Sequence, residues 1–174
     1  MISLNVVFSW LNEFQGSSLT RPDTILRDVM RQKIRERKFF EAYQVIDYLK
    51  SCENYRVNGF ERGEIWMEYG LAYYDMGNLI EAIDSLKKAE KEYPAGHHEH
   101  AVALWMLGTV QWCFENDHAE ALMNWKEAIE EFRLLERIHE QACQVEEKNW
   151  YCARITEMEA RLIHCTRAKF ICTS

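Results

Sequence analysis

Histidine and cysteine residues are the side chains of this 174-residue sequence whose types suit metal or nucleophilic chemistry. Residues 97–100 read His-His-Glu-His, and His139 precedes Cys143 by one helical turn, a spacing that could hold two zinc ligands. No further pair has a ligand spacing, so we expect an exposed polar junction and no metal ion. Because His164 and Cys165 are adjacent, a helix would point them about 100° apart, and adjacency alone does not make them a catalytic pair.

The sequence also lacks the motifs of enzymes and the features of nucleic-acid or membrane binding. It has no glycine-rich phosphate loop, no paired catalytic carboxylates and no nucleophile motif, so we expect no enzymatic activity and no cofactor. The net charge of −7 disfavours nucleic acid as a partner, because phosphate contacts dominate that affinity. No apolar run approaches the ~18 residues that would span a membrane, so we expect no membrane partner.

Six cysteines occur without any Cys-x-x-Cys pair, and they fall in segments of predicted helix. A secreted disulfide framework is typically shorter and richer in loops. We therefore expect reduced, buried thiols and a cytoplasmic protein.

The elements that must position these residues are helical. Residues 63–94 predict two short helices joined by a tight turn, in which Gly77 can adopt a positive φ and Pro94 ends the second helix. Spacings of three and four residues place one apolar face on the first helix: Trp66, Tyr69, Gly70 and Tyr73. Gly70 costs roughly 1 kcal/mol inside a helix, which is tolerable where a second helix approaches closely.

This unit recurs along the chain. The step from Gly70 to Gly108 is 38 residues (108 − 70), and the step from Ala82 to Ala121 is 39 (121 − 82). Ala42 lies 40 residues before Ala82 (82 − 42), which indicates a degenerate earlier copy. The recurrence predicts stacked helical hairpins.

The pattern of Trp, Gly, Tyr, Ala, Ala and Pro in residues 63–94 resembles the tetratricopeptide repeat. The resemblance implies one all-α domain over residues 1–174, a right-handed superhelix of about three such hairpins with helical caps. The predicted organisation is an N-terminal helix and linker (1–22), a degenerate repeat (23–56), the best repeat (63–96), a third repeat (101–135) and one or two capping helices (137–170). We expect a linker at 58–63. Near Lys148-Asn149 we expect a kink or a break, because the stripe that includes Ile138, Ala142 and Val145 changes phase there.

In this family the first helix of each repeat lines a concave groove, so the resemblance also implies a binding surface. The groove-facing positions are Met67, Leu71 and Tyr74 in one repeat, and Trp105, Thr109 and Trp112 in the next. They predict an apolar, aromatic groove that binds a peptide or a helix. Some members clamp a terminal carboxylate with Lys, Arg and Asn, but Glu64 and Glu68 occupy the matching face here, which disfavours that mode.

Arg27, Arg31 and Arg35 are spaced to form a basic stripe near the groove. It could receive an acidic peptide or a phosphate. Alternatively it is a solvated face that pairs with acidic residues of the chain.

The sequence therefore predicts an adaptor or regulatory scaffold that binds another protein. Four alternatives stay open: a groove filled by the chain's own terminal helix, a homodimer formed through the groove or the apolar segment 162–170, a small-ligand enzyme or sensor, and the regulatory part of a larger signalling system.

Overall fold

The computed structural model describes residues 22–52, 59–114, 118–142 and 144–172 of the chain. Within these ranges it contains helices and no strand, as the sequence predicts for an all-α fold. The helices are α2 (Pro22–Arg35), α3 (Phe39–Cys52), α4 (Gly59–Asp75), α5 (Leu79–Glu92), α6 (His98–Cys113), α7 (His118–Gln141) and α8 (Val145–Cys172).

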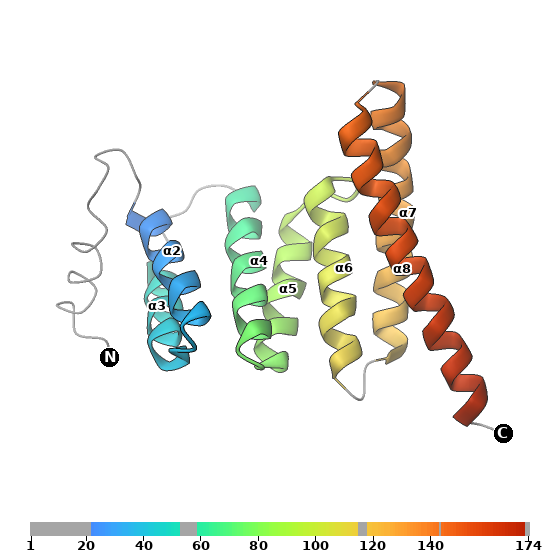
Figure 1. Cartoon of the computed structure of the whole chain (residues 1–174). Helices are drawn as coiled ribbons and strands as arrows, with labels where there is room; N and C mark the ends of the chain where they lie inside the picture. Colours follow the sequence, from blue (N-terminus) through green and yellow to red (C-terminus); the bar gives the residue numbers. More distant parts are fainter. Residues whose placement is uncertain (1–21, 53–58, 115–117, 143, 173–174) are drawn as a thin grey trace.

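Consecutive helices pack against one another as hairpins, in the order α2 with α3, α4 with α5 and α6 with α7. The last helix, α8, packs on α7. In Figure 1, α2, α4, α6 and α8 lie in front, and α3, α5 and α7 lie behind them. The molecule is thus a row of hairpins in which the first helices share one side.

The turns within the first two described hairpins have the same geometry. Gly77 has φ 80°, and the amides of Gly77 and Asn78 donate to carbonyls three and five residues earlier, at 2.9 and 2.8 Å. Arg37 has φ 58°, and Arg37 and Lys38 donate in the same pattern, also at 2.9 and 2.8 Å. Such bonds satisfy the last carbonyls of a helix and require a left-handed residue. Gly77 confirms the prediction, and Arg37 occupies the position 40 residues earlier (77 − 37).

Two repeat glycines mark close approaches between helices. A Cβ on Gly70 would lie 2.6 Å from Cγ of Leu86, and a Cβ on Gly108 would lie 2.6 Å from Cδ1 of Trp125. Any side chain would collide there, because real Cβ contacts are much longer. The predicted reason for a glycine inside a helix is confirmed at Gly70.

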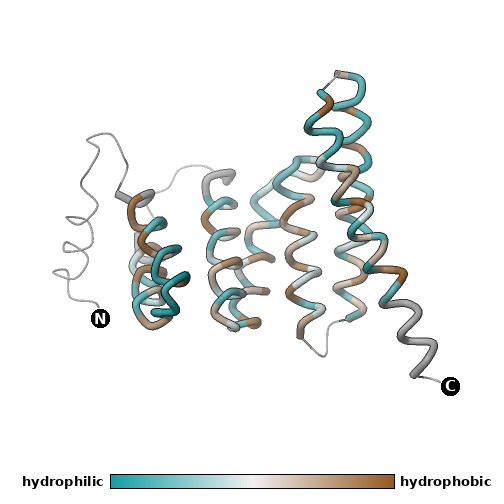
Figure 2. Tube along the Cα trace, viewed as in Figure 1, coloured by the Kyte–Doolittle hydropathy of each residue, from teal (hydrophilic) through white to brown (hydrophobic). Residues whose placement is uncertain are grey.

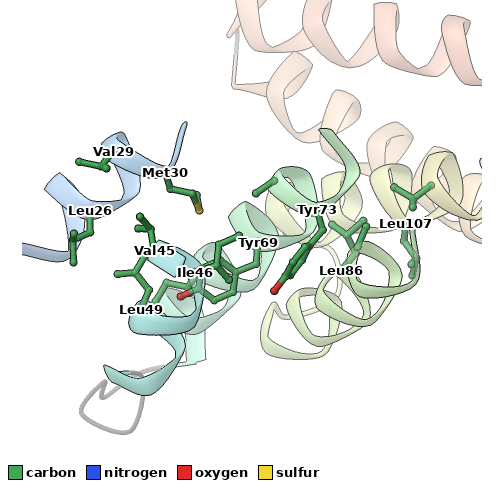
Figure 3. Packing of buried hydrophobic residues seen from close by; sticks show 14 residues of the cluster. Leu26, Val29, Met30, Val45, Ile46, Leu49, Tyr69, Tyr73, Leu86 and Leu107 are labelled. Carbon is green, nitrogen blue, oxygen red and sulfur yellow. The ribbon is translucent and has the colours of Figure 1, made fainter. Parts of the chain in front are cut away.

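The core runs along the row of hairpins in two main clusters. The first spans α2 to α6, and Figure 3 shows its side chains from α2 and α3 near Tyr69 of α4. The second spans α6, α7 and α8 around Trp125 and Phe132. Helix α6 contributes Leu107 to the first and Leu104 to the second, so it joins the two halves. A stack of hairpins buries its apolar faces in this way, since each unit covers its neighbour.

The predicted linker at 58–63 is wrong over most of its length, because α4 begins at Gly59. Gly63 is buried, and a Cβ there would lie 2.7 Å from the Tyr93 ring. This glycine serves a close helix approach inside α4 and does not mark a connection between units.

The predicted break between two helices exists, but it lies between Gln141 and Val145; the predicted position near Lys148-Asn149 is wrong, since both residues lie within α8. Helix α7 runs to Gln141, and the amide of Gln144 donates to the carbonyl of His139 at 2.9 Å as the chain reverses. The apolar stripe suggested by Ile138, Ala142 and Val145 is exposed, because these residues lie around the reversal at one end of the α7–α8 hairpin.

The predicted N-terminal helix at 1–22 lies outside the described residues except for Pro22, the first residue of α2. Figure 2 shows hydrophobic and hydrophilic residues alternating along each helix. Within the part of the chain that the structure describes, no helix is both long and apolar enough to cross a membrane.

Candidate functional site

The three predicted groove residues of α4 have different surroundings. Met67 packs against the small cluster that joins α5 to α6, and Leu71 is 36% exposed. Tyr74 is half-buried, and the charge of Cys113 of α6 is the main reason that the pKa of Tyr74 is raised; burial and a hydrogen bond to Cys113 add to it. Leu71 is therefore the member of this set that is most open to a partner.

The three predicted groove residues of α6 are half-buried by other parts of the chain. Trp105 lies under the Arg154 guanidinium, whose Cζ is 5.4 Å from the ring centroid. Trp112 stacks on Trp125 of α7 with ring centroids 5.5 Å apart. Thr109 donates to the carbonyl of Trp105 at 2.9 Å. Side chains of α7 and α8 thus contact the aromatic stretch that we expected to face a peptide.

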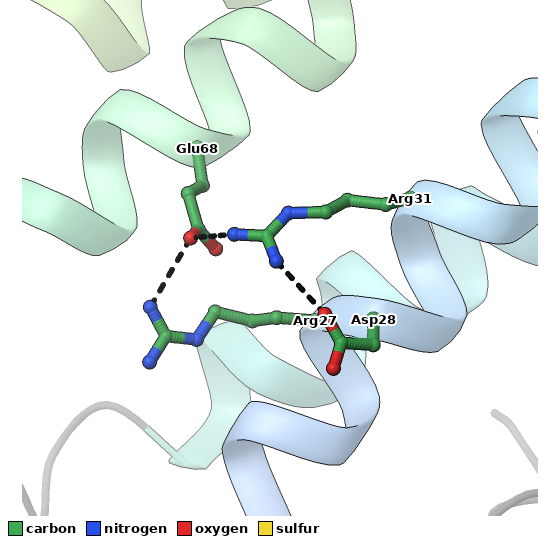
Figure 4. Close-up of polar contacts among 4 residues, drawn as sticks. All are labelled: Arg27, Asp28, Arg31 and Glu68. Atoms are coloured by element: carbon green, nitrogen blue, oxygen red, sulfur yellow. Dashed lines mark hydrogen bonds and ion pairs between the residues drawn. The ribbon is translucent and has the colours of Figure 1, made fainter.

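The predicted basic stripe on α2 is partly neutralised by α4. Figure 4 shows Glu68 between Arg27 and Arg31, with Arg27 Nη1 3.3 Å from Glu68 Oε1 and Arg31 also paired to that oxygen. Arg31 additionally pairs with Asp28 at 2.8 Å. These contacts favour the alternative in which the stripe serves the chain's own ion pairs. Arg35 differs, because it forms no ion pair with any residue that the structure describes.

A hollow of about 260 Å³ lies between α2 and α4 and brings the two predicted surfaces together. Its apolar lining comes from both helices, and Arg31, Arg35, Glu68 and Asp75 supply the charges. The volume suits one large side chain, being just below the range of about 300–1,000 Å³ that is usual for small-molecule sites. The full lining is Met30, Arg31, Ile34, Arg35, Glu68, Leu71, Ala72 and Asp75.

The histidine-rich segment at 97–100 is split between two environments. His100 is 5% exposed, and its Nδ1 lies 2.8 Å from Oε2 of Glu131. The other oxygen of Glu131 accepts the Gly96 amide at 3.1 Å. Glu131 therefore joins α7 to the connection between the second and third hairpins. His98 instead packs among aromatic rings of α7 and α8.

A second cavity, which sequence reasoning did not identify, lies beside His98. It has a volume of about 510 Å³ and is lined by His98, Glu146, Glu147, Trp150 and Tyr151. Residues on α6 and α8 form it, and 52 positions separate His98 from Trp150 (150 − 98). The only available signal was the aromatic and acidic composition of residues 146–151, which no motif connects with His98.

The fold does not bring the described metal-ligand side chains together, and two described cysteines are free thiols. Among residues 25–50, 62–114, 118–142 and 144–164, no three His, Cys, Asp or Glu side chains gather where they could hold one metal ion. Cys113 and Cys152 are free thiols. Cys113 is exposed, so the prediction that the cysteines are buried is wrong for this residue.

The chain matches none of the protein-family models with which we compared it, and it matches no curated protein.

Proposed function

We propose that this chain is a protein-interaction module, a right-handed superhelix of the tetratricopeptide type that acts as an adaptor or regulatory scaffold. Support comes from the repeated hairpins, the matched turns at Arg37 and Gly77 and the close approaches at Gly70 and Gly108. Solenoids of this kind present an extended surface on the side of their first helices.

The observation that carries the proposal is the hollow between α2 and α4. In this proposal the chain binds a peptide or helix segment at the hollow. The segment inserts one apolar side chain against Leu71 and places a carboxylate near Arg35. Arg35 and Asp75 are exposed and form no ion pair with a described residue, so both rim charges are available to a partner. Met67, Tyr74, Trp105, Thr109 and Trp112 extend the contact surface toward α6.

The free energies involved indicate how much of the surface a bound segment must cover. Burying an apolar anchor contributes about 1.5–3 kcal/mol, and a hydrogen bond to a charged group contributes about 1.5–3 kcal/mol. Association costs roughly 4–15 kcal/mol. The hollow alone therefore does not hold a partner, and a bound segment must continue along the neighbouring first helices.

The test is selection of binders from a random-peptide library on the wild-type chain, followed by affinity measurements on variants. We expect Leu71→Asp and Arg35→Glu each to weaken the selected peptides by about tenfold or more, since each removes one anchor. Ile80→Asp is the matched control, because Ile80 is 67% exposed but lies on α5. Peptides that bind Leu71→Asp as tightly as wild type would exclude this site.

A homodimer is the second candidate, and one observation favours it. Ile163 of α8 is 53% exposed, and the end of α8 projects beyond α6 and α7 in Figure 1. A copy of the chain could cover this face. Light scattering tests the idea: Ile163→Asp should convert a dimer to a monomer, and a wild-type chain that is strictly monomeric at micromolar concentration contradicts it.

A further inference from the structure

The larger cavity, at the N-terminal ends of α6 and α8, is wide open and is lined in part by a cluster of aromatic rings. His98 and Trp150 have ring centroids 4.9 Å apart, and His98 and Tyr151 have centroids 5.7 Å apart. Trp150 and Tyr151 meet edge to face at 88° with centroids 5.4 Å apart. Centroids this close mean that the three rings pack on one another on one side of the cavity, where Trp150, 39% exposed, offers an indole face that can attract a cation.

The charge around this cavity is negative. Glu146 and Glu147 line it, and neither they nor the nearby Glu99 form an ion pair with a described residue. Burial raises the pKa of Tyr151, and the charges of Glu99 and Glu147 raise it further. Glu99 and Glu147 are therefore close enough to act on the Tyr151 hydroxyl, and their negative charge would attract a cation to the cavity.

His98 adds no competing positive charge. Burial lowers the pKa of this imidazole, so the ring is neutral near pH 7. Its Nδ1 is buried and has no hydrogen-bond partner among the described residues. A neutral imidazole does not repel a cation bound against the neighbouring Trp150 ring.

One ring of the cavity already has a cation near it. The guanidinium carbon of Arg154, one turn along α8, is 5.8 Å from the Trp150 centroid, and Arg154 is held by Glu157 at 2.7 Å. This contact involves a residue outside the cavity lining, and Trp150 remains 39% exposed.

We propose that this cavity binds an alkylammonium group. The exposed face of Trp150, backed by His98 and Tyr151, would contact the cation, while Glu146 and Glu147 would supply the opposite charge. Two sources carry this chemistry: a methylated lysine of a partner protein, and a free quaternary ammonium compound. The proposal does not depend on the hollow between α2 and α4.

The test compares choline with 3,3-dimethylbutan-1-ol, its uncharged isostere, by nuclear magnetic resonance titration of the intact chain. The Trp150 indole signal, assigned with Trp150→Phe, should shift with choline and respond to the neutral compound about tenfold more weakly or worse. A peptide carrying trimethyllysine forms the second arm. Tighter binding of the peptide indicates a protein partner, and tighter binding of choline indicates a free ligand.

Variants separate the site from general surface charge. Glu147→Gln should weaken the cation about threefold to fivefold, whereas Glu127→Gln, at an exposed position of α7, should leave its affinity unchanged. Trp150→Ala should abolish binding, with circular dichroism to check folding and Glu147→Gln as the variant that keeps the shape. Equal binding of both compounds, or no shift at about 10 mM cation, where a site of about 1 mM Kd would be nearly full, overturns the proposal.

Discussion

Arg37 has a backbone conformation that is determined by the turn in which it lies. Its φ of 58° is the left-handed conformation that the repeat requires between α2 and α3, and glycine fills the same position at Gly77. A non-glycine residue in this conformation costs roughly 1–2 kcal/mol, because its Cβ crowds the following carbonyl. The first hairpin therefore carries a local strain that the second does not.

Arg37→Gly should stabilise the protein. Relief of the left-handed strain outweighs the entropy that glycine loses on folding, about 0.5–1 kcal/mol, so we expect a net gain of about 0.5–1 kcal/mol. Urea denaturation followed by circular dichroism measures it. Lys38→Gly is the control, since Lys38 has no positive φ, and it should destabilise. A loss of stability in Arg37→Gly would show that its side chain matters more than its backbone.

At the scale of elements, a buried histidine and a half-buried glutamate join the second hairpin to the third. Glu131 of α7 accepts from the Gly96 amide and bonds to His100 of α6. His100 Nε2 also lies 3.6 Å from Glu90 of α5. This network links three helices, so it constrains how α6 and α7 sit against α5. Apolar packing alone is less directional.

His100→Ala should therefore destabilise the fold by about 1–3 kcal/mol, because it leaves Glu131 without a buried partner. The control is Glu130→Gln, whose pair with Arg133 is exposed and contributes only about 0–1 kcal/mol. Thermal or urea unfolding gives both values. If the two variants lose the same stability, the buried network has no special role.

At the scale of the whole molecule, stability is distributed along a row of hairpins, each touching its neighbours. Such a row behaves as nearly independent units joined by interface terms. The Glu68 ion pairs with Arg27 and Arg31 tie α2 to α4 across the interface between the first two hairpins. Glu68 is only 18% exposed at its side chain, so its loss leaves Arg27, equally shielded, without this partner.

Glu68→Ala should loosen the first hairpin selectively. Hydrogen exchange should show opening free energies that are lower by about 1–2 kcal/mol in α2 and α3, with α7 and α8 unchanged. Glu157→Ala is the matched control, because Glu157 pairs with Arg154 and Arg161 inside α8. A uniform loss of protection over all helices would mean that the chain unfolds as one unit.

Sequence alone was sufficient for the all-α class, the helical hairpins, the Gly77 turn, the end of α5 before Pro94 and the close approach at Gly70. Each of these depends on local properties: hydrophobic period, backbone freedom of glycine and the restriction that proline imposes. The packing of one element against another does not follow from local properties, and the errors arose there. Gly63 resembles a linker residue until Tyr93 is placed against it, and the stripe through Ile138 resembles a core face until the α7–α8 reversal leaves it in solvent.

The candidate surfaces were also predictable only where they depend on local properties. Periodicity placed Leu71 and the arginines on their helix faces. Only the packing of α4 beside α2 decided that Glu68 forms ion pairs with Arg27 and Arg31 and not with Arg35. Likewise, only the packing of α8 decided that Arg154 covers Trp105 and that Trp150 packs on His98 beside a cavity. Residue spacing determines which side chains share one face of a helix. Which other residues that face contacts depends on how the hairpins stack, and stacking is a property of the whole chain.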